Sequence, residues 1–226
     1  MLLYVLMKDK MLFILASLAA LCFNNWLLGL ILNHQLLFKA GAVSELSAAG
    51  QPHQVIFRCL DIVSGFLFVA LGITIIAKYR SLQRANYLAF GAIVLGIANT
   101  ADALRYLPCS ETMDRNCVIP VELSRSHFMI PPHGYSSVAI SVCYLLLPIA
   151  GLFYARSIRS RNFTIISALL ISLAAVYMLA SFSEYYITGS FGEKAWGPSQ
   201  EMQMLLLGTW FIIWARSYEY LPAQPK

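Results

Sequence analysis

Three acidic side chains and one imidazole lie within otherwise apolar segments, and they are the residues best able to do chemistry: Asp61, Asp102, Glu201 and His133. We expect Asp61, Asp102 and His133 to act as a general base with its orienting partner, or to hold a divalent metal. Glu184 or Glu201 would supply an acid. Such a set is typical of hydrolysis or group transfer. The sequence leaves the cofactor unknown, with a divalent metal as the one candidate.

Polar side chains that could contact a bound molecule accompany these residues at helical spacing. Asn99 and Asp102 are three residues apart, so they share one face of a helix. Asp61 and Ser64 have the same spacing. If these faces point inward, they form a polar hollow. The candidate binding residues are Ser44, Glu45, Ser64, Asn99, Ser137 and Glu184.

Both aspartates also have a purely structural interpretation. Arg58 lies three residues before Asp61 and could neutralise it within the same helix. Arg105 lies three residues after Asp102 and could do the same. The sequence leaves open whether these aspartates form ordinary ion pairs near an interface or a shared site.

The remaining candidates have alternatives of the same kind. His133 follows two prolines, which favour the start of a helix, so it could be a solvated residue at that start. Glu184 could be solvated at a helix end. Glu201 lies in the first turns of a helix, where a carboxylate interacts favourably with the helix dipole. Only the arrangement of these residues in space can separate the two interpretations.

A short polar stretch, "RYLPCSETMDRNC", interrupts the apolar segments and carries Cys109 and Cys117. A disulfide between them would close a small external loop, as is common in oxidising compartments. A zinc site that adds His127 and His133 is an alternative, and free thiols are another. We expect Cys22, Cys59 and Cys143, which fall within helices, to be small buried residues.

The elements that must position these residues are membrane helices. The 226 residues are 59% hydrophobic and 12% charged, whereas soluble domains are about 25% charged. Several apolar runs reach the roughly 20 residues that a helix needs to cross a bilayer. The sequence predicts an all-α single domain over 1–226, with spans at about 11–32, 55–77, 86–106, 133–155, 163–186 and 197–215. Outer loops are then expected at 33–54, 107–132 and 187–196.

The basic residues predict the orientation of this bundle. Ten of the sixteen lie on one side, which predicts that both termini are cytoplasmic. The net charge of +5 is therefore a membrane-orientation signal and does not indicate nucleic-acid binding. We expect Trp26, Trp210 and Trp214 to face lipid or the interface, and Asn24 or Asn25 to bond a neighbouring helix.

Several motifs in their order along the chain resemble a known family. They are "VSELSAAGQP" (43–52), "DIVSG" (61–65), "YLPCSETMDRNC" (106–117), "PHGYSS" (132–137) and "GPSQ" (197–200). The chain resembles the bacterial and archaeal "domain of unknown function 998" membrane proteins over roughly 25–217. This resemblance implies a multi-pass protein of the cytoplasmic membrane and no particular activity. A much weaker similarity points to the transmembrane hydrolases related to alkaline ceramidase.

Three classes of function fit these observations. The first is an enzyme that acts on a lipid or lipid-linked substrate at the outer leaflet. The second is a non-catalytic accessory protein that binds another membrane or cell-envelope protein. The third is a small-solute carrier, although carriers usually place their sites near the membrane midplane within repeats, and no repeat is visible.

Overall fold

The computed structural model describes residues 2–38, 42–114, 116–117, 132–188 and 196–218. These residues form helices joined by turns, with no strand among them. The helices are α1 (Leu2–Phe23), α2 (Trp26–Leu32), α3 (His34–Phe38), η1 (Val43–Ser47), α4 (Gln54–Lys78), α5 (Gln83–Leu104), α6 (Pro132–Ile158), α7 (Arg161–Thr188) and α8 (Trp196–Ser217). The all-α prediction is confirmed.

Several of these helices are long and apolar enough to cross a membrane. Within the described ranges they are Gln54–Lys78, Gln83–Leu104 and Tyr135–Ile158, and the bent pair Lys10–Phe23 and Trp26–Leu32 makes a fourth candidate. The chain is therefore a helical bundle of the kind found in membranes.

The predicted single helix 11–32 is broken at Asn24–Asn25, where the chain bends by 43°. The side-chain amide of Asn24 donates to the Ala20 carbonyl oxygen at 2.8 Å, four residues earlier in the chain. The amides of Leu27 and Leu28 bond carbonyls only three residues back, at 3.1 and 2.8 Å. Polar side chains that compete for backbone partners, together with such tighter bonds, are recognised causes of helix bending.

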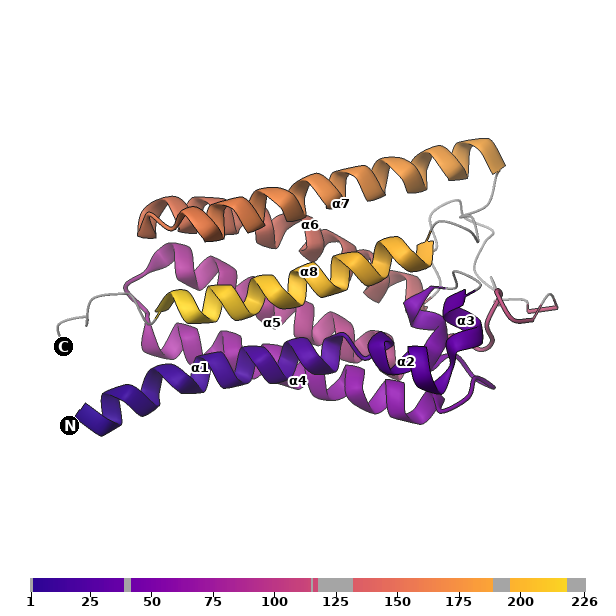
Figure 1. The fold of residues 1–226 in the computed structure, drawn as a ribbon, viewed down its shortest axis with the longest axis horizontal. Helices are drawn as coiled ribbons and strands as arrows, with labels where there is room; N and C mark the ends of the chain where they lie inside the picture. The colour runs from indigo at the N-terminus through magenta and orange to yellow at the C-terminus, as the bar shows by residue number, and fades with distance from the viewer. Residues whose placement is uncertain (1, 39–41, 115, 118–131, 189–195, 219–226) are drawn as a thin grey trace.

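Helix α8 lies between α7 and α1 and packs against both (Figure 1). The first turns of α1 and the last turns of α8 lie at one end of the molecule, and α2 and α3 lie at the other (Figure 1). Helices α4 and α5 pack against each other through glycine. A Cβ atom added to Gly65 would lie 2.6 Å from the Gly96 carbonyl oxygen, so only glycine permits this approach.

Aromatic rings fill the bundle at the end where α8 finishes, and we call this cluster the aromatic end: Tyr79, Tyr154, Phe163, Trp210, Phe211, Trp214 and Tyr218. Trp210 and Trp214 stack with their ring centroids 5.7 Å apart. The prediction that Trp26, Trp210 and Trp214 face lipid is wrong, because all three are buried. Trp210 packs on Gly151 and donates its indole N–H to Ser167 at 2.8 Å.

Candidate functional site

Asp61 lies on α4 about two turns from its start, beside the break between α1 and α2. The Asn25 amide reaches across from that break and donates to the Asp61 carboxylate at 2.6 Å. The same amide nitrogen lies 3.4 Å from the Phe57 carbonyl oxygen. The prediction that an asparagine of this pair bonds a neighbouring helix is confirmed for Asn25.

Helices α4 and α5 are linked at the same level by a second amide. Asn99 donates from Nδ2 to the Ser64 hydroxyl at 2.7 Å and to the Asp61 carbonyl oxygen at 2.8 Å. Both Ser64 and Asn99 are buried. Their polar faces therefore turn toward each other across the α4–α5 interface.

The Asp102 carboxylate links α5 to α6. The Ser136 hydroxyl donates to Asp102 Oδ1 at 2.7 Å, and the Ser137 hydroxyl donates to the same oxygen at 3.1 Å. Asp102 also lies close enough to Asp61 for the two charges to interact. Four helices thus bring amides, hydroxyls and two carboxylates together, and we call Asn25, Asp61, Ser64, Asn99, Asp102, Ser136 and Ser137 the polar network.

Arg58 does not neutralise Asp61, so that structural alternative is wrong. Its guanidinium donates to the Ser47 carbonyl oxygen and to Gln54, each at 2.7 Å, and lies 3.2 Å from the ring centroid of Tyr106. These partners draw the side chain toward η1 and the start of α4, because a guanidinium offers several donors and a flat face for an aromatic ring.

The structure tests the metal prediction only in part. No three His, Cys, Asp or Glu side chains of the described residues lie close enough together to hold a metal ion. The backbone of His133 lies in the first turn of α6 and that of Glu184 near the end of α7, but both side chains are outside the described set. Glu201 is half-buried on α8, without a hydrogen bond to another described residue.

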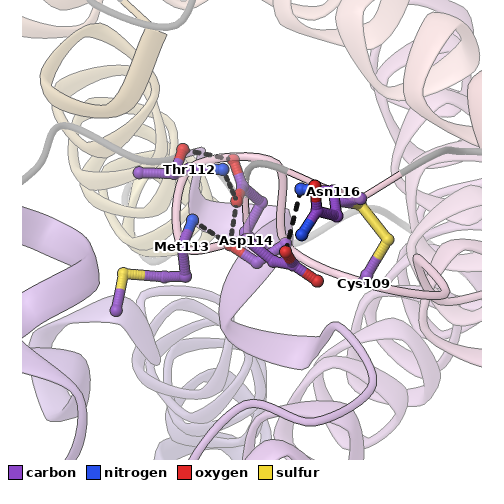
Figure 2. Close-up of a disulfide and its surroundings, with 8 residues drawn as sticks. Cys109, Thr112, Met113, Asp114 and Asn116 are labelled. Carbon is purple, nitrogen blue, oxygen red and sulfur yellow. Dashed lines mark hydrogen bonds between the residues drawn. A yellow bond between two sulfur atoms is a disulfide. The ribbon is translucent and has the colours of Figure 1, made fainter.

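The Glu45 carboxylate forms part of a hydrogen-bonded structure that we call the outer cap, made of η1 and the loop 107–114. Glu45 is buried and accepts hydrogen bonds from the hydroxyls of Ser110 and Thr112 and from the Thr112 backbone amide. The Ala42 amide donates to the same carboxylate at 3.3 Å. Figure 2 shows Thr112 and Met113 on the loop side of these contacts. Glu45 therefore holds the cap together.

Cys109 and Cys117 form the predicted disulfide, with their Cα atoms 5.7 Å apart (Figure 2). Both sulfur atoms are used in this bond, so neither is available as a zinc ligand. The other cysteines differ from one another: Cys143 is buried as predicted, Cys22 is half-buried, and Cys59 is exposed on α4.

Comparison with protein-family models shows to which family the chain belongs. The model described as "Protein of unknown function (DUF998)" matches residues 14–217. The chain belongs to the DUF998 family. No significant match was found among curated proteins or among solved structures. None of these comparisons supports the similarity to alkaline-ceramidase-related hydrolases.

The polar network of this DUF998 protein includes two residues that sequence reasoning did not select. Asn25 was expected to bond a helix, although not to contact Asp61, and its position beside a second asparagine was the available signal. Ser136 precedes the selected Ser137 and makes the shorter bond to Asp102. Ser44, which was selected, contributes its carbonyl oxygen to Ser47 within η1.

Proposed function

We propose that this DUF998 protein crosses the cytoplasmic membrane of a bacterium or archaeon six times, with both termini in the cytoplasm. The even number of crossings agrees with Figure 1, in which the first turns of α1 and the last turns of α8 lie at the same end of the bundle. Basic residues at the helix ends there support a cytoplasmic location: Lys78, Arg84, Arg156, Arg161 and Arg216. The polar network and the outer cap would then lie toward the external face.

The activity that we propose is hydrolysis or group transfer on a lipid or lipid-linked substrate at the outer leaflet. One observation carries this proposal: the Asp102 carboxylate accepts hydrogen bonds from two serine hydroxyls of the next helix, at 2.7 and 3.1 Å. A nucleophile within hydrogen-bond reach of a base is the arrangement that covalent catalysis needs.

In this mechanism Ser136 or Ser137 attacks a carbonyl or phosphoryl centre of the substrate, and Asp102 takes the hydroxyl proton as the new bond forms. Asp102 then passes this proton to the leaving group. Water or an acceptor alcohol, deprotonated by Asp102, next displaces the group from serine, and the serine oxygen takes back a proton from Asp102. His133 comes four residues before Ser137 in the sequence and is the candidate for an orienting or proton-transferring role.

A fluorophosphonate probe tests the proposal without knowledge of the substrate, because it reacts with activated serines. We expect mass spectrometry of the protein in lipid nanodiscs to find the probe on Ser136 or Ser137. Asp102→Asn should lower the labelling rate at least roughly 100-fold, in the range that general-base catalysis contributes.

Ser141→Ala is the matched control, since Ser141 lies one turn further along α6 and donates to the Ser137 carbonyl oxygen. It should label as the wild type does. Equal labelling of the wild type and Asp102→Asn, or none at either serine, would count against the enzyme.

A non-catalytic partner protein is the second candidate, and the outer cap favours it. A disulfide and a buried carboxylate give this loop a fixed shape, which is useful for recognising another envelope protein. In cells, Glu45→Gln would then abolish function while Ser136→Ala with Ser137→Ala would preserve it. The hypothesis that the protein is an enzyme predicts instead that the double serine variant loses function.

A further inference from the structure

The amide groups of the polar network use their hydrogen-bond donors within the protein. Asn25 Nδ2 contacts the Phe57 carbonyl oxygen and the Asp61 carboxylate, and Asn99 Nδ2 contacts the Asp61 carbonyl oxygen and the Ser64 hydroxyl. A side-chain amide nitrogen carries two N–H donors, so Asn25 and Asn99 each have both donors occupied. Only oxygen atoms are left to meet a bound molecule.

The side-chain carbonyl oxygens of Asn25 and Asn99 are not paired with a hydrogen-bond donor of the described residues. Asn25 and Asn99 are 3% and 6% exposed, yet neither side-chain carbonyl oxygen receives a hydrogen bond from another described residue. Neither oxygen is fully enclosed either, because the fully enclosed partnerless atoms of the described chain belong to Asn86, Gln203, Trp214 and Tyr218. Two almost buried acceptors, on residues that both contact Asp61, therefore remain for a ligand.

The charge of Asp61 points to the same kind of ligand. The nearest basic residue on its helix, Arg58, is bonded to Ser47 and Gln54. An ionised carboxylate at membrane depth is costly unless a positive charge accompanies it.

We propose that Asp61, Asn25 and Asn99 bind a positively charged group: an inorganic monovalent cation or the ammonium of a lipid headgroup. The two sources share one chemistry, since oxygen acceptors coordinate a metal cation or accept the N–H donors of an ammonium. The helix break beside Asn25 supports the assignment, because interrupted membrane helices commonly supply oxygens for cations. This site goes beyond the proposed hydrolase and would exist even if neither serine reacts.

Thermal unfolding of the protein in zwitterionic nanodiscs tests the site, with tryptophan fluorescence as the signal. Trp26 is well placed as a reporter, since its indole bonds Asn24 beside the site. Sodium, potassium or ethanolamine chloride replaces N-methylglucamine chloride at constant ionic strength. Between 1 and 100 mM we expect at least one of them to raise the midpoint by roughly 3–8 °C. A response to ethanolamine alone identifies a headgroup, and a response to sodium or potassium identifies an ion.

Asp61→Asn keeps the size of the side chain and should abolish this rise. The matched control is Asp114→Asn, an identical change on an exposed carboxylate that accepts a hydrogen bond from the Asn116 amide. It should keep the full rise. Asn25→Ala retains the charge and removes one oxygen, so its half-saturating concentration should increase at least roughly 10-fold. No rise in the wild type, or an equal rise in Asp61→Asn, would overturn the proposal.

Discussion

The aromatic end and the polar network lie in one helix bundle but are held together differently. At the aromatic end, rings such as Trp210 and Trp214 pack on each other and on glycine. In the polar network, amides and hydroxyls bond carboxylates on neighbouring helices. Lipid is as apolar as a leucine side chain, so close contact stabilises the first region and directional hydrogen bonds stabilise the second. The stability of the aromatic end should therefore depend most on side-chain shape. The stability of the polar network should depend most on which side-chain groups can form hydrogen bonds.

The largest effect is expected when the shape of the aromatic end is broken. Trp210→Ala removes a fully buried ring and should lower the free energy of unfolding by about 3–5 kcal/mol. Denaturant titration of the protein in mixed micelles, followed by circular dichroism, measures this loss. Probe labelling of Ser136 and Ser137 in the fraction still folded should not change. Trp210→Phe, which keeps a flat ring, is the control and should cost clearly less.

Removing the disulfide should have the next largest effect, and it should be confined to the outer cap. The double variant Cys109→Ser with Cys117→Ser frees a short loop. The chain-entropy model predicts that this lowers the free energy of unfolding by about 2–3 kcal/mol. Limited proteolysis should cut the loop faster, while the fluorescence of the aromatic end stays constant. A reducing agent should give the wild type the same sensitivity. Unchanged proteolysis would contradict the role of the disulfide in the cap.

Changing chemical type without changing shape tests the same cap more finely. Glu45→Gln places an amide nitrogen against the donors of Ser110 and Thr112, and should cost about 1.5–2 kcal/mol. Hydrogen exchange of the Thr112 amide, which now bonds the carboxylate, should speed up. Exchange at that amide as slow as in the wild type would show that the charge is dispensable.

The smallest effect should come from the hydrogen bond within the aromatic end. Ser167→Ala removes the acceptor of the Trp210 indole and should cost about 1 kcal/mol. Denaturant titration measures it, and Ser172→Ala on the exposed face of α7 is the matched control. A loss as large as that of Trp210→Ala would contradict the view that packing, rather than hydrogen bonding, stabilises the aromatic end.

The helices and the disulfide could be predicted from the sequence, whereas the inward faces of the helices could not. Apolar runs indicate membrane helices, and two cysteines in one short polar loop indicate a disulfide. Lipid-facing and buried positions are both apolar, so nothing in composition marks Trp210 as interior. The available signal was small residues on other helices, such as Gly151 and Ser167, which leave room for a large ring.

The candidate site was predictable by helix face but not by partner. The three-residue spacings of Asp61 with Ser64 and of Asn99 with Asp102 place each pair on one face, and Asn99 bonds Ser64 across the α4–α5 interface. Spacing alone left an ion pair between Arg58 and Asp61 open. The pair does not form, because Arg58 finds the Ser47 carbonyl oxygen and the Tyr106 ring, which come from distant parts of the chain.

The position of α8 between α1 and α7 has a consequence for the biosynthesis of the protein. Ribosomes make the chain from its amino end, so α8 leaves the ribosome after every other described helix. Until then, the surfaces of α1, α6 and α7 that receive Gly208 and Trp210 must face lipid or an insertion factor. The earlier segments can enter the membrane as they are made, but the interior is completed only by the segment that arrives last.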